Sequence, residues 1–125
     1  MEKSNVTNSS KKPYDLEERT FQFAKEVRLL VKNLHKTTAN LEDVKQLVRS
    51  SGSVGSNYIE ANESLSKKDF SFRIKISRKE AKESVYWLRL IMETNTLSNK
   101  KEFENLLQEA TELKKIFSAI IDKSK

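Results

Sequence analysis

The sequence predicts an all-α protein, folded as an antiparallel up-down-up-down four-helix bundle. The chain contains two glycines and one proline, the residues that most often interrupt helices. Apolar residues recur at spacings of three and four along four stretches, as on the buried side of an amphipathic helix. The links between these stretches are short, which favours antiparallel neighbours that cross at about 20°.

The first helix is expected over residues 16–34. Asp15 is its candidate cap, with Glu18 reaching back from the third position. Its apolar stripe is unusually broad and consists of Phe21, Phe23, Ala24, Val27, Leu29, Leu30, Val31 and Leu34. This width leaves open an alternative, a three-helix core with the first helix docked elsewhere or exchanged between protomers.

The second helix is expected over residues 41–64, with Asn40 as its cap and Asp43 in its first turn. The third is expected over 67–95, where Ser66 is the cap and Asp69 the third residue after it. Its core positions follow spacings of 4, 3, 4, 3, 4 and 3 and are Phe70, Ile74, Ser77, Ala81, Ser84, Leu88 and Ile91. The fourth helix is expected over 100–122, capped by Asn99.

Length and composition predict one domain, residues 14–125, after a disordered polar tail of residues 1–13. The 125 residues, 36% of them hydrophobic, suffice for a single core. Cysteine is absent, so disulfides and thiolate metal sites are excluded and a reducing cytoplasm is the expected location. No apolar stretch has the length of a signal peptide or of a membrane span.

A stripe of positive charge on the third expected helix is the main candidate site. The chain carries 24 basic and 18 acidic residues, a net charge of +6, and residues 66–95 contribute +4 of it. Because a helix drifts by only about 20° over seven residues, basic residues that recur every seven positions share one face. The candidate nucleic-acid-binding residues are Lys68, Phe72, Lys75, Lys79, Lys82, Tyr86 and Arg89.

Basic charge interleaved with aromatic rings suits a phosphate backbone and unstacked bases. Lysines outnumber arginines in the stripe, which favours electrostatic contact with the backbone over reading of base edges. The competing interpretation is a solvated helix face, with Phe72 and Tyr86 packed against a neighbouring helix or subunit.

A second polar pattern lies on the second expected helix, where Gly52 and Gly55 allow a neighbouring helix to approach closely. Its polar side chains are expected to meet charged residues of the third helix, either in a buried hydrogen-bond network that fixes helix register or in a polar pocket or subunit contact. The candidate members of this polar network are Ser53, Asn57, Glu60, Arg78, Glu80 and Glu83.

Catalytic and metal-binding patterns are missing from the sequence. It contains no nucleophile elbow, no phosphate-cradling glycine loop and no cysteine-histidine pair. A carboxylate-bridged metal site in a bundle requires Glu-x-x-His pairs, whereas the one histidine, His35, lies in an expected loop. We therefore expect neither enzyme activity, nor a metal, nor a cofactor.

Three blocks of the sequence resemble the 23S ribosomal RNA intervening-sequence protein family, also called the four-helix-bundle protein family. They are DLEERTFQFAKEV (15–27), SSGSVGSNYIEANES (50–64) and RKEAKESVYWLRLI (78–91). The resemblance implies a bacterial four-helix bundle assembled as a homopentamer. A relative that serves diversity-generating retroelements binds nucleic acid and a reverse transcriptase, so RNA, DNA or a reverse transcriptase are partners that the resemblance implies.

Two functions follow as expectations. One is an oligomeric nucleic-acid-binding or accessory protein, and the other is a structural oligomer or protein scaffold without a nucleic-acid role. If the chain self-associates, the broad apolar stripe of the first helix predicts an interface that buries part of Phe21, Phe23, Tyr58 or Trp87.

Overall fold

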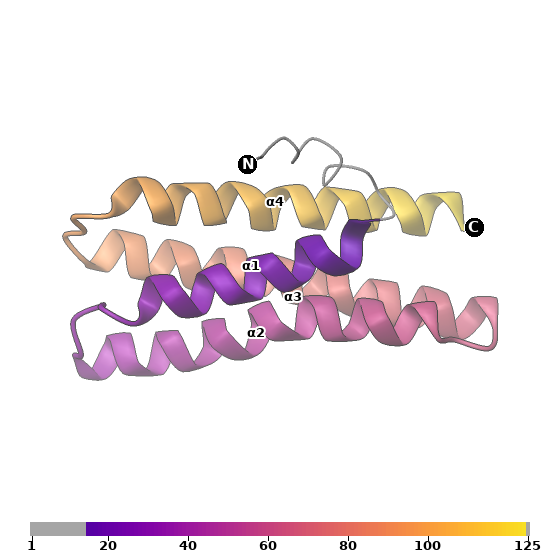
Figure 1. The fold of residues 1–125 in the computed structure, drawn as a ribbon, viewed down its shortest axis with the longest axis horizontal. Helices are drawn as coiled ribbons and strands as arrows, with labels where there is room; N and C mark the ends of the chain where they lie inside the picture. Colours follow the sequence, from indigo (N-terminus) through magenta and orange to yellow (C-terminus); the bar gives the residue numbers. More distant parts are fainter. Residues whose placement is uncertain (1–14, 125) are drawn as a thin grey trace, which may run out of the picture.

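The computed structural model describes residues 15–124, which form four α-helices. They are α1 (Leu16–Val31), α2 (Thr38–Asn62), α3 (Lys67–Thr94) and α4 (Lys100–Lys123). Successive helices run in opposite directions (Figure 1), so the all-α bundle predicted from the sequence is confirmed. The tail expected over residues 1–13 lies outside the described residues.

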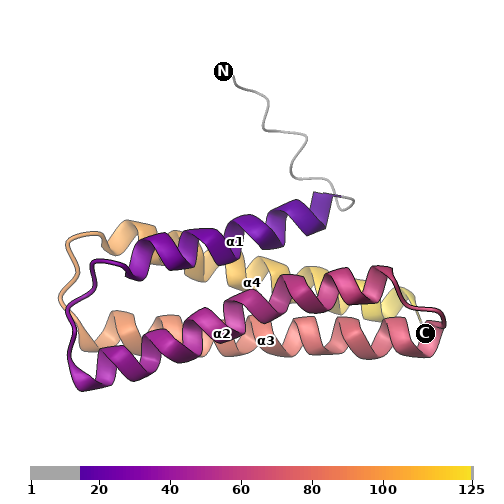
Figure 2. The same cartoon turned by 60° about the horizontal axis from the view of Figure 1, so that its bottom comes forward.

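Each helix packs closely against two others, whereas the backbones of the diagonal pairs, α1 with α3 and α2 with α4, stay farther apart. α2 and α4 both contact α3 extensively, whereas α1 joins α2 and α4 less closely. Figure 2 shows α2 lying alongside α3. From α1, Leu16, Phe23 and Val27 are buried in the same core as the other helices. Because α1 contributes to this core, the alternative of a three-helix core with α1 docked elsewhere is wrong.

The helix starts test the predicted caps. The Ser66 hydroxyl accepts a hydrogen bond from the Asp69 backbone N–H at 3.0 Å, which confirms the cap of α3. The cap predicted for α2 is wrong, because Thr37 accepts the bond from the Asn40 N–H at 3.1 Å and the helix begins at Thr38. Asn40 is instead nearly buried inside the first turn, where its side chain bonds across the bundle. Asp15 and Asn99 hold the N-cap positions of α1 and α4 without a side-chain cap bond.

The end of α1 also differs from the prediction. The helix stops at Val31, three residues before the expected end. Leu34 lies in the turn that follows, where its N–H donates to the Val31 carbonyl at 3.2 Å. Its side chain still packs against the core. The apolar spacing continues past the end of α1 because Leu34, a residue of the turn, also packs against the core.

α1 and α2 approach closely where a glycine faces a threonine. A Cβ at Gly55 would lie 2.9 Å from the Thr20 hydroxyl oxygen and 3.1 Å from its Cβ. The Thr20 hydroxyl is buried and fixed by donation to the Leu16 carbonyl at 2.8 Å. At Gly52, an added Cβ would meet only the end of the Arg28 side chain, at 3.1 Å. Glycine is therefore required only at position 55, because the neighbouring Thr20 side chain is fixed in place.

Substituting each glycine by alanine should separate these two environments. Gly55→Ala is expected to lower the free energy of unfolding by about 1 to 3 kcal/mol, because the new methyl overpacks the α1–α2 contact. Gly52→Ala is expected to raise it by up to about 1 kcal/mol, since the flexible Arg28 end yields and alanine favours the helix. Chemical denaturation of both variants measures the difference. Equal effects of the two substitutions would contradict the close contact.

The seam between α1 and α4 is joined by an ion pair. Arg19 donates to both carboxylate oxygens of Glu109, at 2.7 and 2.9 Å. These hydrogen bonds raise the pKa of the Arg19 guanidinium above its ordinary value. The planar, two-bond geometry fixes how the two helices sit against each other along this side of the bundle.

Candidate nucleic-acid interface

α3 presents a buried side and an exposed side along its whole length. The buried side faces the core and consists of Ile74, Ser77, Glu80, Ala81, Ser84, Leu88 and Ile91. The seven residues predicted to bind nucleic acid are all exposed, and they are Lys68, Phe72, Lys75, Lys79, Lys82, Tyr86 and Arg89. The spacing of about 3.5 residues keeps each set on one face of the helix.

The cations of this face differ in how far they are already neutralised. Lys75 and Lys82 form no ion pair with any residue in the range 15–124. The Lys79 ammonium lies 3.8 Å from a carboxylate oxygen of Glu80. Arg89 pairs with Glu93 one turn on at 3.3 Å, an exposed contact of the kind that contributes little. Positive charge is therefore available in the middle of the exposed face.

At the start of α3, carboxylates lie close to the cations. Phe72 lines a surface hollow at the α2–α3 connection together with Glu60, Glu63, Asp69 and Arg73. Three carboxylates and one guanidinium line this hollow, while Lys68 and Lys75 flank Phe72 on α3 itself. These carboxylates weaken the attraction of the cations to a phosphate backbone at this end of the helix, so we define the basic surface as residues 75–89 of α3.

Tyr86 lies within this basic surface, between Lys82 and Arg89. Residues four before and three after a helical position share its face, so both cations flank the tyrosine. The Tyr86 ring meets the Trp87 ring edge-on, with centroids 4.9 Å apart and planes at 84°. Trp87 is itself half-buried and packs against the core. The tyrosine is thus braced by a fixed neighbour while 58% of it remains exposed.

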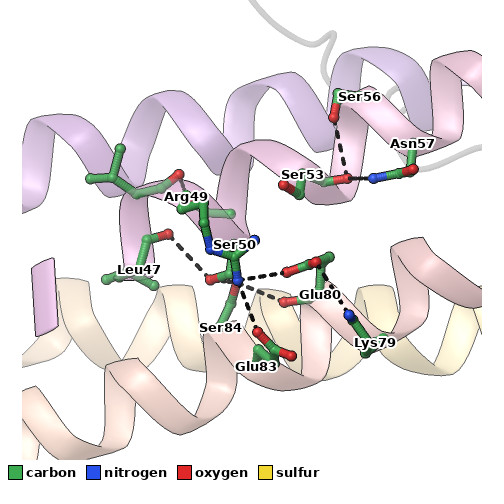
Figure 3. A network of polar contacts seen from close by, with 12 residues as sticks. Leu47, Arg49, Ser50, Ser53, Ser56, Asn57, Lys79, Glu80, Glu83 and Ser84 are labelled. Atoms are coloured by element: carbon green, nitrogen blue, oxygen red, sulfur yellow. Dashed lines mark hydrogen bonds and ion pairs between the residues drawn. The ribbon is translucent and has the colours of Figure 1, made fainter. Parts of the chain in front are cut away.

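A cluster of charged side chains joins α2 to α3 beside the basic surface. Figure 3 shows Arg49 reaching from α2 toward two glutamates of α3. Its guanidinium donates to Glu83 at 3.0 Å and to Glu80 at 3.3 Å. Glu80 is only 5% exposed, so this cation offsets much of the cost of removing its carboxylate from water.

Beneath this cluster, small hydroxyl residues let α2 and α3 pack closely. Ser50 and Ser84 are fully buried, and their hydroxyl oxygens share a hydrogen bond of 2.9 Å (Figure 3). Further along, the Ser77 hydroxyl donates to the Val54 carbonyl at 2.9 Å. Because each buried hydroxyl has a partner, the polar atoms fix the register of the two helices at little energetic cost.

The structure divides the predicted polar network. Asn57 donates to the Ser53 carbonyl at 2.9 Å and accepts a hydrogen bond from Arg73 at 3.0 Å. Glu60 is exposed beside the α2–α3 connection, and Arg78 forms no side-chain hydrogen bond or ion pair with residues 15–124. The expectation that Asn57 or Glu60 meets Arg78, Glu80 or Glu83 is therefore wrong.

Antiparallel register explains the error. Ser50 faces Ser84 and Asn57 faces Arg73, so Glu60, nearer the connection, lies opposite the start of α3. Arg78 precedes Glu80 by two residues, which is about 200° around a helix, so it lies on a different flank from the residues that contact α2.

The four aromatic residues considered for a subunit interface have different environments. Phe23 is buried in the bundle core and cannot reach a second subunit, so it is removed from that set. Phe21 is 60% exposed. The Tyr58 ring packs against that of Phe117, with centroids 6.0 Å apart, and both Tyr58 and Trp87 are half-buried.

Within residues 15–124, no three histidine, cysteine, aspartate or glutamate side chains lie close enough together to hold a metal ion. His35 is exposed between α1 and α2. Over the same range, each helix is too short or too polar to cross a membrane.

Comparison with known proteins agrees with this architecture. Residues 12–119 match the sequence model of 23S rRNA-intervening sequence proteins, a span that contains α1, α2, α3 and most of α4. The chain belongs to the 23S rRNA-intervening sequence protein family.

A solved relative of this 23S rRNA-intervening sequence protein has the same fold. It is a protein of unknown function from the S23 ribosomal protein family of Bacteroides thetaiotaomicron VPI-5482. The two chains are 30% identical and superpose with a TM-score of 0.77, over 87% of this chain and 96% of the other. A comparison with curated proteins finds no match.

One residue beside the basic surface, Arg49, was not predicted from the sequence. Arg49 is the α2 partner of Glu80 and Glu83. A signal for it was present, because pairing residues outward from the short connection at 63–66 places Arg49 opposite residues 80–83. Register counted from this connection predicts the pairing, whereas chemical type alone does not.

Proposed function

We propose that this 23S rRNA-intervening sequence protein is a non-catalytic nucleic-acid-binding or accessory protein that contacts phosphate backbones through residues 75–89 of α3. The observation that carries the proposal is the exposed pair Lys75 and Lys82, which no carboxylate of the described residues neutralises. Unpaired ammonium groups on a rigid helix attract polyanions without prior loss of an internal ion pair.

The spacing of the cations supports contact with several phosphates. Lys75 and Arg89 are separated by about 21 Å at 1.5 Å per residue. A nucleic-acid strand places several phosphates along such a distance. Lysine presents a point charge without the planar fork that reads guanine edges, so the contact is expected to be largely independent of base sequence.

Titration of labelled structured RNA and labelled single-stranded DNA at two salt concentrations tests the proposal. If Lys75, Lys79, Lys82 and Arg89 each contact one phosphate, affinity should fall roughly 50- to 150-fold between about 50 and 200 mM salt. Binding releases salt counterions that are condensed on the nucleic acid, and this release is less favourable when the salt concentration is higher. Fluorescence anisotropy measures the dissociation constants. An absence of binding at the lower salt concentration would remove this function.

A second candidate function, a structural oligomer, is favoured by a different observation. Phe21 and Leu29 remain 60% and 49% exposed on α1 although the core already holds the other side of the helix. Contiguous apolar patches on a monomer surface mark contacts with other molecules, and we propose that Phe21 and Leu29 contribute to such a patch. The family resemblance implies a homopentamer, which we retain as the proposed assembly.

Light scattering at micromolar concentration tests self-association. The assembly predicts a mass several times the 14.5 kDa of one chain, and Phe21→Lys with Leu29→Lys should reduce the mass without loss of helicity. A monomer mass for the unmodified protein would reject the oligomer. The nucleic-acid proposal does not depend on this outcome.

A further inference from the structure

Two exposed aromatic residues on α3 differ in what surrounds them. Phe72 and Tyr86 are 59% and 58% exposed on the same outer face of the helix. Phe72 lines the hollow at the α2–α3 connection, where the three carboxylates of Glu60, Glu63 and Asp69 outnumber the guanidinium of Arg73. Tyr86 lies between Lys82 and Arg89 and rests edge-on against Trp87. Two cations of α3 flank each ring, Lys68 and Lys75 for Phe72 and Lys82 and Arg89 for Tyr86. The rings differ because three carboxylates line the hollow beside Phe72, whereas Tyr86 is held against Trp87.

We propose that Tyr86 is a base-stacking position, and that the basic surface of α3 therefore takes single-stranded nucleic acid in preference to a duplex. This inference rests on the proposed function, which supplies the backbone contact. Lys82 and Arg89 hold the phosphates on either side of one nucleotide, and the base of that nucleotide lies on the tyrosine ring.

The physical basis is the availability of base faces. In a duplex the bases are already stacked and paired, so an exposed ring on a helix surface gains nothing from them. In a single strand each base has a free face, and stacking on an aromatic side chain stabilises the complex whatever the base. Contact with Trp87 restricts the Tyr86 ring before binding, so less rotamer freedom is lost when a base arrives.

The experiment compares Tyr86→Leu with Phe72→Leu in the full chain. Both variants remove an aromatic ring of nearly equal exposure from the same helix face and keep an apolar side chain. The ligands are a labelled single-stranded DNA oligonucleotide and the blunt duplex of the same length, at one salt concentration. Tyr86→Leu should weaken single-strand binding about 5- to 100-fold and leave duplex binding unchanged. Phe72→Leu should change neither, and Tyr86→Phe should retain the single-strand affinity.

Each outcome separates the inference from the proposed function. Equally tight, salt-sensitive binding of the single strand and the duplex would overturn the stacking position and leave backbone binding in place. Equal losses of single-strand affinity in Tyr86→Leu and Phe72→Leu would have the same consequence. No salt-sensitive binding of either ligand would overturn both. Emission of Trp87, the single tryptophan, gives a local readout, because a base stacked on Tyr86 changes the surroundings of the adjacent indole.

Discussion

Reversing the charge at Lys75 and Lys82 together is expected to weaken nucleic-acid binding by about 100-fold or more at low salt. Each lysine is exposed and unpaired within the described residues, so Lys75→Glu and Lys82→Glu replace attraction to phosphate by repulsion. Both side chains are exposed, so circular dichroism should show unchanged helicity. Fluorescence anisotropy with labelled RNA measures the loss of affinity.

Lys101→Glu with Lys115→Glu is the matched control, since both lysines are exposed on α4 and the net charge changes by the same amount. Affinity should fall far less in this variant, because its lysines lie outside α3. If both double variants lost affinity equally, binding would depend on net charge alone. The double variant at Lys75 and Lys82 could instead unfold or dissociate, while the remaining folded oligomer binds nucleic acid with unchanged affinity. That result would mean that these lysines stabilise the protein and do not contact phosphate. In an oligomer the basic surfaces repeat, so one substitution acts at every copy.

Asn40→Ala is expected to produce the largest loss of stability, about 2 to 4 kcal/mol. Asn40 is 3% exposed, and its amide pairs reciprocally with that of Asn95, through bonds of 2.8 and 2.9 Å. It also donates to the His35 carbonyl at 2.7 Å. These bonds tie the α1–α2 turn to the end of α3. Truncation removes all three bonds at once, so the Asn95 amide retains its bond to the Ile91 carbonyl and the His35 carbonyl its bond from the Thr37 N–H, but nothing joins the turn to α3 through Asn40.

Urea denaturation of Asn40→Ala measures this loss. Asn33→Ala is the control, because Asn33 is exposed in the same turn region and makes no side-chain hydrogen bond within residues 15–124. Its effect should stay within about 0.5 kcal/mol. A loss below about 1 kcal/mol for Asn40→Ala would mean that the amide pair does not hold this end of the bundle together.

The features that sequence predicted well are local ones. Ser66 precedes α3 with a suitable residue three positions on, and hydrogen bonding within one turn decides such a cap. The buried seam of α3 follows from spacing alone, so Ile74, Ala81 and Leu88 were placed correctly. The exposure of the lysine stripe followed from the same periodicity.

The features that sequence missed depend on contacts between distant segments. Asn40 has the chemistry of a cap, but the bond to Asn95, distant in sequence, determines its place, and Thr37 caps α2 instead. The carboxylates beside Phe72 come partly from the end of α2, so a pattern read along α3 alone could not show them. The partner of Glu80, Arg49, required the register between two helices.

The salt dependence of binding tests the central claim most directly. Log affinity should fall linearly with log salt concentration, and each phosphate contact contributes about 0.7 to 0.9 to the slope. Lys75→Gln with Lys82→Gln should therefore reduce the magnitude of the slope by about 1.4 to 1.8 relative to the unmodified protein. Lys101→Gln with Lys115→Gln should leave it unchanged. An unaltered slope in the Lys75 and Lys82 variant would contradict the assignment of α3 as the phosphate-binding surface.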